Sequence, residues 1–254
     1  NIFVRPHPVS NFTINDTDQC LRGNSFVFTN SSSISSGTYT NLWKFGDNTT
    51  STVVSPTRVY ITAGNYLPRL IATSNYGCKD SLIKNVYVRP HPGSAFGVNN
   101  NSQCLRGNLF VYTNITSISS GTYTSLWKFA ANTTLAIASP SHTFASAGTF
   151  ATRLVTTSDY GCKDSITSNV FVRPHPVTNF TLNDTSRCLR GNVFVFTNTS
   201  SISSGTYTNL WKFGDNTTSA VASPSKTYAA VGTYTPRLVT TSNFGCKDSL
   251  SKTV

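Results

Sequence analysis

Apolar and polar residues alternate along this chain in short segments with a period of two residues. In Leu42-Trp43-Lys44-Phe45, Trp43 and Phe45 should face one side of a strand and Lys44 the other, because successive side chains of a strand point to opposite faces of the sheet. Gly, Asn, Ser and Pro end these segments after about five to eight residues. Short alternating segments separated by turn residues predict an all-β sandwich.

The pattern predicts seven strands in the first third of the chain, at residues 9–14, 25–29, 40–45, 50–54, 57–60, 66–73 and 81–88. Trp43 lies in the middle of one of them and is predicted to anchor the core, as are Trp127 and Trp211 at the same place further along. The alternative for these tryptophans is an exposed ring that stacks on a sugar. A position flanked by alternating polar residues favours the core.

The whole pattern occurs three times with a spacing of 84 residues, as the positions of Cys20, Cys104 and Cys188 show. We therefore predict three repeats, at residues 5–88, 89–172 and 173–254, with the last strand of the third one truncated. Residues 1–4 correspond to the end of a preceding repeat. The sequence is expected to be a segment of a longer array.

Each repeat has two cysteines, 58 residues apart, with no Cys-x-x-Cys pair. This usage favours disulfides and an oxidising location outside the cytoplasm over a metal site. The periodicity leaves two families of pairing. One lies within repeats (Cys20 with Cys78, Cys104 with Cys162, Cys188 with Cys246), and the other joins adjacent repeats (Cys78 with Cys104, Cys162 with Cys188). The first is favoured, because closing such a loop should stabilise a small domain by about 4 kcal/mol.

Composition argues against several classes of function. The chain has nine Asp and no Glu, and its net charge of +11 is spread over all three repeats. One His is shared by every repeat, between two prolines, so no catalytic residues, metal site or cofactor are predicted. Scattered Lys and Arg do not indicate a nucleic-acid binder, although they could attract an acidic surface polysaccharide. No apolar run approaches the roughly 20 residues of a membrane span.

Several motifs together resemble the PKD (polycystic kidney disease) domain, an Ig-like β-sandwich. They are Trp43-Lys44-Phe45-Gly46-Asp47-Asn48, Ser55-Pro56-Thr57-Arg58-Val59-Tyr60, Ala63-Gly64-Asn65-Tyr66 and Asn75-Tyr76-Gly77-Cys78. The placing of the cysteines resembles PKD repeats of large Bacteroidota cell-surface adhesins. That resemblance implies pairing within each domain, an extracellular location at the cell surface and no catalytic residues. Asp-Ser-apolar triplets also resemble Bacteroidota O-glycan acceptors, at Ser81, Ser165 and Ser249.

The repeats differ from one another at a few informative positions. Gly46-Asp47 is replaced by Ala130-Ala131 in the second repeat, which disfavours a metal site common to all repeats. Pro68 and Pro236 predict an edge or a bulge where the second repeat has Thr152. On the opposite face of that strand, a regularly spaced aliphatic residue predicts lateral contact between identical chains in a filament, at Ile71, Val155 and Val239.

These features predict a structural and adhesive repeat array of an extracellular protein or filament, which serves as a stalk and as a surface for protein–protein contact. Its partners would be the neighbouring repeats and identical chains. The alternative is a set of carbohydrate-binding or spacer repeats in a secreted multidomain hydrolase. The Arg-Pro-His-Pro linkers between repeats are expected to be short and stiff, because each proline restricts its own residue and the preceding one.

Overall fold

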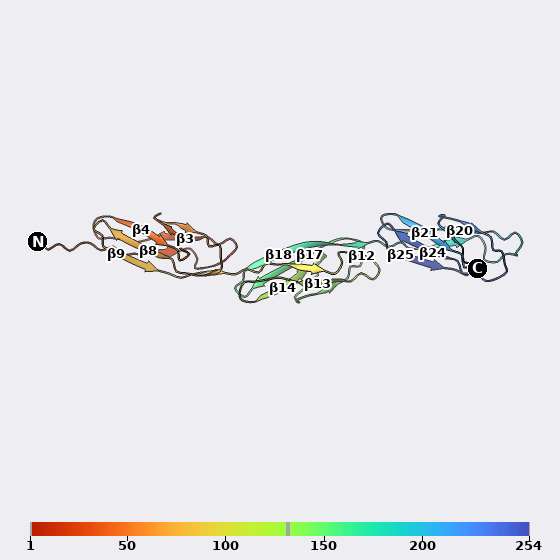
Figure 1. The fold of residues 1–254 in the computed structure, drawn as a ribbon, viewed down its shortest axis with the longest axis horizontal. Coiled ribbons are helices and arrows are strands. Elements are labelled where there is room, and N and C mark those ends of the chain that lie inside the picture. The colour runs from red at the N-terminus through yellow and green to blue at the C-terminus, as the bar shows by residue number, and fades with distance from the viewer. Residues whose placement is uncertain (1, 131–132, 254) are drawn as a thin grey trace.

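Three β-sandwiches follow one another along an elongated molecule, and the termini lie at opposite ends (Figure 1). The computed structural model describes residues 2–130 and 133–253. All of its named elements are β-strands, and they form tandem Ig-like sandwiches as the alternating pattern predicts.

The first repeat contains ten strands. They are β1 (Phe12–Ile14), β2 (Asp18–Cys20), β3 (Phe26–Asn30), β4 (Tyr39–Lys44), β5 (Thr50–Ser51), β6 (Thr57–Arg58), β7 (Gly64–Tyr66), β8 (Arg69–Ser74), β9 (Lys79–Ile83) and β10 (Val86–Arg89). Three sheets result, with strand orders β1-β3-β6, β5-β4-β8-β9 and β2-β10-β7.

The inward-facing residues of these strands form an aromatic core. Trp43 has no exposed surface and contacts Phe12 edge to face, with ring centroids 5.0 Å apart. Its Nε1 donates a hydrogen bond to the carbonyl of Val53 at 2.9 Å, so the polar edge of the ring is satisfied. Trp127 and Trp211 are equally buried in the cores of their own repeats, which leaves no surface for stacking on a sugar.

Two features of the first repeat differ from the predicted strands. The predicted strand at 81–88 is divided into β9, which pairs with β8, and β10, which pairs with β7 and belongs to another sheet. The predicted set also lacks β2, which pairs in parallel with β10. Asp18-Gln19-Cys20 has no alternating apolar residues, because this strand lies at the edge of its sheet.

The second repeat contains β11 (Phe96–Val98), β12 (Ser102–Cys104), β13 (Phe110–Asn114), β14 (Tyr123–Lys128), β15 (Thr134–Leu135), β16 (Ser141–His142), β17 (Gly148–Ser158) and β18 (Lys163–Arg173). Here β17 is continuous, whereas the first repeat has a break between β7 and β8 at Pro68. Thr152 replaces that proline and is fully buried. Its hydroxyl oxygen Oγ1 lies 2.9 Å from the hydroxyl oxygen of Tyr112. The predicted strand at 66–73, with an edge or a bulge at Pro68, is instead divided into β7 and β8, because proline cannot donate to the ladder.

The third repeat contains β19 (Phe180–Leu182), β20 (Phe194–Asn198), β21 (Tyr207–Lys212), β22 (Thr218–Ser219), β23 (Ser225–Lys226), β24 (Arg237–Ser242) and β25 (Lys247–Ser251). Its sheets have the orders β19-β20-β23 and β22-β21-β24-β25. Residues 186–188 and 232–234, which correspond to β2 and β7, are not strands here.

Candidate interface between neighbouring repeats

The disulfides join neighbouring repeats. Cys20 of the first repeat is bonded to Cys162 of the second, and Cys104 of the second to Cys246 of the third, with a Cα–Cα distance of 5.6 Å in both bonds. The predicted pairing within repeats (Cys20 with Cys78, Cys104 with Cys162, Cys188 with Cys246) is therefore wrong. The alternative pairing of Cys78 with Cys104 and Cys162 with Cys188 is also wrong. Cys78 and Cys188 are unpaired.

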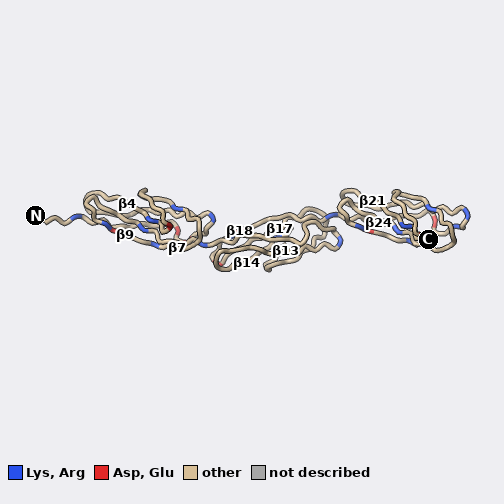
Figure 2. Tube along the Cα trace, in the orientation of Figure 1, with Lys and Arg blue, Asp and Glu red and all other residues tan. Residues whose placement is uncertain are grey.

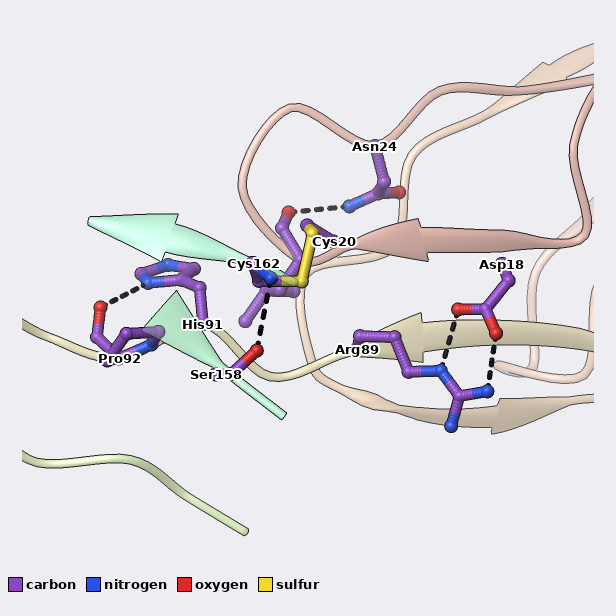
Figure 3. Close-up of a disulfide and its surroundings, with 9 residues drawn as sticks. Asp18, Cys20, Asn24, Arg89, His91, Pro92, Ser158 and Cys162 are labelled. Atoms are coloured by element: carbon purple, nitrogen blue, oxygen red, sulfur yellow. Dashed lines mark hydrogen bonds and ion pairs between the residues drawn. A yellow bond between two sulfur atoms is a disulfide. The ribbon is translucent and has the colours of Figure 1, made fainter. Parts of the chain in front are cut away.

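The position of each cysteine in the sandwich explains this connectivity. Cys20 ends β2, at the end of the repeat where β10 leads into the linker. Cys162 lies in the turn between β17 and β18, where its N–H donates to Ser158 Oγ at 3.1 Å (Figure 3). In the second repeat, Cys104 and Cys162 bond to opposite neighbours, so they lie at opposite ends of one sandwich. A disulfide requires Cα atoms within about 7 Å, which two such ends cannot provide.

An ion pair lies beside each disulfide. Arg22 Nη1 is 2.6 Å from Asp164 Oδ1, and Arg106 Nη1 is 2.8 Å from Asp248 Oδ1. The second carboxylate oxygen of Asp164 accepts a hydrogen bond from the N–H of Ser94 at 2.8 Å, just after the linker. Asp164 thus binds the main chain next to the linker within its own repeat. It also forms an ion pair with the arginine of the preceding repeat.

The carboxyl group of Asp164 is held in its charged form. Burial by itself raises its pKa, but the N–H groups of Ser94 and Ser165 and the charge of Arg22 outweigh burial, so that the pKa lies below its ordinary value. Asp248 has a lowered pKa for the same reasons, with Thr178, Ser249 and Arg106 in these roles. Both ion pairs therefore persist throughout the neutral pH range. Because Arg22 and Arg106 are largely exposed, each pair should contribute no more than about 1 kcal/mol.

A cation–π contact completes each junction. The guanidinium of Arg89 lies over the ring of Tyr160, 4.4 Å from its centroid, and that of Arg173 lies 4.6 Å from the centroid of Phe244. Arg89 is held in place by two hydrogen bonds to Asp18, one of them 2.6 Å long from Nε (Figure 3). Arg173 Nε instead donates to Ser102 Oγ at 2.8 Å. The arginine at the end of the last strand of one repeat thus packs on an aromatic ring of the next repeat.

A shallow groove of about 380 Å³ lies at each junction. The first is lined by residues that include Gly64, Arg89 and Tyr160, and the second by their equivalents Gly148, Arg173 and Phe244. The Lys and Arg residues outside the junctions are distributed along all three repeats, without a single dense patch (Figure 2).

The junction contains residues that sequence reasoning did not select. Every first cysteine is followed two residues later by an arginine, at Arg22, Arg106 and Arg190, and every second cysteine by an aspartate, at Asp80, Asp164 and Asp248. This complementary charge was the available signal for pairing between a first cysteine and the second cysteine of the next repeat. Spacing alone could not reveal it.

The residues predicted for lateral contact lie on the outer face of each sandwich. Ile71, Val155 and Val239 are half-buried and are paired across the sheet with Leu42, Leu126 and Leu210, respectively. The predicted O-glycan acceptors Ser81, Ser165 and Ser249 follow on the next strand, and their hydroxyls accept hydrogen bonds of 2.8, 2.9 and 2.7 Å from Arg69, Arg153 and Arg237. Both assignments remain predictions.

Asp47 has a local role. Its carboxylate accepts hydrogen bonds from the N–H of Thr49 at 3.0 Å and from Nε of Arg58 at 2.8 Å, which is turn chemistry of the kind expected for Gly-Asp. Ala131, its counterpart in the second repeat, lies outside the described residues. Within residues 2–130 and 133–253, no group of three or more His, Cys, Asp or Glu side chains is placed to hold a metal ion.

Comparison with known proteins gives a family match. The family model described as "PKD domain" matches residues 6–89 and 173–254. No curated protein matches the chain. In the part of the chain that the structure describes, no helix has the length and apolar character needed to cross a membrane.

Solved structures similar to the chain include two from Vibrio. The PKD1 domain of Vibrio anguillarum Epp is 26% identical, with 33% of this chain and 94% of that one covered and a TM-score of 0.29. The PKD1 domain of the Vibrio cholerae metalloprotease PrtV is 34% identical, with 32% and 96% covered and a TM-score of 0.29. A structure of a 1.5-MDa bacterial ice-binding adhesin is 8% identical, with 97% and 96% covered and a TM-score of 0.34.

Proposed function

Since the chain belongs to the PKD domain family, we propose that it is a structural and adhesive repeat array of an extracellular surface protein or filament. In this role it is a stiff stalk that also provides surfaces for protein–protein contact. The observation that carries the proposal is the disulfide between each pair of neighbouring repeats. Disulfides persist in oxidising surroundings, which supports a location outside the cytoplasm.

The second covalent connection is what supports a stalk. Domains joined by a peptide linker alone usually move relative to one another, because the interface between them is small and polar. Here each junction has the linker peptide and, beside it, a disulfide flanked by an ion pair and a cation–π contact. Two connections side by side restrict bending and twisting about either one. The array therefore holds whatever lies beyond it at a fixed distance.

The outer faces of the sandwiches supply the contact surface in this proposal. One exposed or half-buried aliphatic pair per repeat, of which Leu42 and Ile71 are the first, recurs at the spacing of the repeats. Regular spacing lets identical chains associate side by side in a filament, since one contact geometry serves every repeat. The adjacent Ser81, Ser165 and Ser249 are proposed as O-glycan acceptors on the same face.

Electron microscopy of the purified chain tests the stalk. Oxidised molecules should be straight rods, and the double variant Cys20→Ser/Cys104→Ser should bend at the two junctions, because only the linkers remain. The matched control is Cys78→Ser/Cys188→Ser, which removes the unpaired thiols and should stay straight. Oxidised rods that bend as freely as the Cys20→Ser/Cys104→Ser variant would rule out a stiff stalk.

A further inference from the structure

The two junction grooves differ in the partner of one arginine. Arg89 and Arg173 have the same place in the repeat, and each lines the groove at its own junction. Both carboxylate oxygens of Asp18 bind Arg89, Oδ1 by accepting from Nε at 2.6 Å and Oδ2 by accepting from Nη2. In the second repeat, Ser102 stands in the place of Asp18. The second junction therefore lacks the carboxylate that the first one holds against the guanidinium.

The Nη atoms of Arg173 are free to bind another group. In the part of the chain that the structure describes, Arg173 forms no ion pair, and its one hydrogen bond is the one from Nε to Ser102 Oγ at 2.8 Å. The N–H groups of a guanidinium form a planar fork that matches the two oxygens of a carboxylate. The side of this fork that Asp18 occupies in the first junction is thus only partly used in the second.

Aromatic rings hold this guanidinium in position. The guanidinium carbon of Arg173 lies 4.9 Å from the ring centroid of Phe171 and 4.6 Å from that of Phe244. Arg89 has the same arrangement over two tyrosine rings, at 4.7 and 4.4 Å. A donor group that is already held in place loses less conformational freedom when it binds a ligand. The two junctions therefore present the same fork, closed by a carboxylate in one and open in the other.

The charges around the open fork also differ between the two junctions. Asn100 stands in the place of Asp16 in the same loop, so the second repeat lacks both acidic residues that precede Cys20 in the first. Asp248, at the second junction, has an arginine partner of its own, 2.8 Å away. The second groove therefore retains a positive charge that no neighbouring carboxylate balances among the described residues.

The remaining lining of the second groove is suited to a sugar. The groove has a volume of about 380 Å³ and is lined in part by Ser203, Ser204 and Phe244. Both serines are exposed, so their hydroxyls can donate to and accept from sugar hydroxyls. Phe244 is 42% exposed, which leaves part of the ring to pack against sugar C–H groups. A few convergent polar groups beside an aromatic ring are typical of sites for small ligands.

We propose that the groove at the second junction binds a uronic-acid residue of an acidic polysaccharide, whose carboxylate contacts Arg173 as that of Asp18 contacts Arg89. The first junction identifies the anion, because a carboxylate is the group that it holds there. Basic residues along all three repeats favour a long polyanion over a short acidic peptide (Figure 2). The inference rests on the adhesive part of the proposed function and not on stiffness, so it can fail while the stalk holds.

Titration of the full oxidised chain with a short oligogalacturonate at low ionic strength, followed by NMR, tests the site. The signals of the Arg173 Nε–H and of the Phe244 backbone N–H should shift. The methyl ester of the same oligomer has no charge and should bind about tenfold more weakly or worse, because the charge-assisted hydrogen bonds are lost. An oligo-aspartate of equal charge represents the competing partner. Tighter binding of the oligo-aspartate would overturn the assignment to a polysaccharide.

A variant that closes the fork provides the sharpest comparison. Ser102→Asp should weaken binding of oligogalacturonate by about tenfold or more, because it places a carboxylate on the guanidinium. This variant should fold normally, since the first junction contains the same pair. Asn100→Asp is the matched control, because it adds the same charge in the same loop. Asn100 accepts the N–H of Ser102 at 2.9 Å, as Asp16 accepts that of Asp18 at 3.0 Å, so this variant keeps the turn and should bind nearly as well as the unaltered chain.

The reverse substitution should create a second site. Asp18→Ser opens the fork of Arg89, so the Arg89 Nε–H signal should then shift with oligogalacturonate as well. The proposal is overturned if the ligand leaves the Arg173 signal unchanged, if Ser102→Asp binds as well as Asn100→Asp, or if Asp18→Ser adds no second site. Electron micrographs of Ser102→Asp should still show straight rods, which separates loss of this site from loss of the stalk.

Discussion

His142 shows how one residue can change the chemistry of a repeat. It occupies the place of Arg58 and Lys226, which pair with Asp47 and Asp215, respectively. In the second repeat the imidazole instead stacks on Phe129, with ring centroids 4.3 Å apart. Burial lowers the pKa of His142, because the charged ring loses solvation. The second repeat has thus exchanged an ion pair for an aromatic stack with a titratable group.

This exchange predicts a pH-dependent stability that is specific to the second repeat. Because the pKa is lower in the folded state, the unfolded chain binds the proton more readily, and the free energy of unfolding falls as the pH drops below about 6.5. Amide hydrogen exchange at about pH 7.5 and about pH 5.5 should show weaker protection of β14 and β17 at the lower pH. The His142→Gln variant should lose this difference.

The third repeat is an internal control for the same experiment. Burial alone would raise the pKa of Asp215, but hydrogen bonds from Lys226 and Thr217 bring it to about 2. The stability that this carboxylate contributes is present above its ordinary pKa of 3.8 and is lost only as the pH falls toward about 2. Protection of β21 and β24 should therefore be unchanged over the range in which the second repeat weakens. An equal loss in both repeats would contradict the role of His142.

At the scale of single elements, one pair of residues determines whether a strand is continuous. The second repeat has Tyr112 with Thr152 and an unbroken β17, whereas the first has Phe28 with Pro68 and a break. The third has Phe196 with Pro236, and β24 begins only after the proline. The buried hydroxyls of Tyr112 and Thr152 satisfy each other, so neither should be replaced alone without cost.

A double-mutant cycle in the second repeat measures this dependence. Tyr112→Phe leaves the Thr152 hydroxyl buried and without its partner, which should lower the free energy of unfolding by about 1–3 kcal/mol. Thr152→Pro should cost at least as much, because it also removes an N–H from the ladder. The double variant has Phe with Pro, as the first repeat has. Its loss of unfolding free energy should be smaller than the sum of the two single losses by about 0.5–3 kcal/mol. Additive costs in chemical denaturation would contradict the coupling.

The elements that sequence reasoning identified were those with buried aromatic residues in alternation. Trp43 and Phe45 mark β4 clearly, and the repeat spacing extends the assignment to all three sandwiches. β2 was missed because an edge strand buries few side chains. The cysteine partners were missed because a sequence shows the spacing of two residues and not the end of the sandwich at which each lies.

For the whole molecule, the disulfides shorten the covalent route between the two ends. The shortest path runs from Asn1 to Cys20, across to Cys162, back to Cys104, across to Cys246 and on to Val254. It contains 88 residues and spans at most about 300 Å, compared with about 860 Å for the reduced chain of 254 residues. Under load, a large part of the chain is bypassed and cannot be extended.

Single-molecule stretching measures this limit directly. The oxidised chain should reach a final contour length of about 300 Å and stop, and addition of a reductant should allow extension to about 860 Å. Cys20→Ser/Cys104→Ser should extend fully without reductant. Disulfides within each repeat would leave a path of nearly the same length, so the oxidised chain alone does not distinguish the two connectivities. The Cys20→Ser/Cys104→Ser variant does, because pairing within repeats would keep the bond between Cys188 and Cys246 and prevent full extension without reductant.

Disulfide mapping decides whether neighbouring repeats are covalently joined. Trypsin places the six cysteines on six separate peptides, because Lys or Arg followed by a residue other than proline lies between each of them. Mass spectrometry of the unreduced digest should find the peptide of Cys20 linked to that of Cys162 and the peptide of Cys104 linked to that of Cys246. Links from Cys20 to Cys78 and from Cys104 to Cys162 would contradict the junction described above.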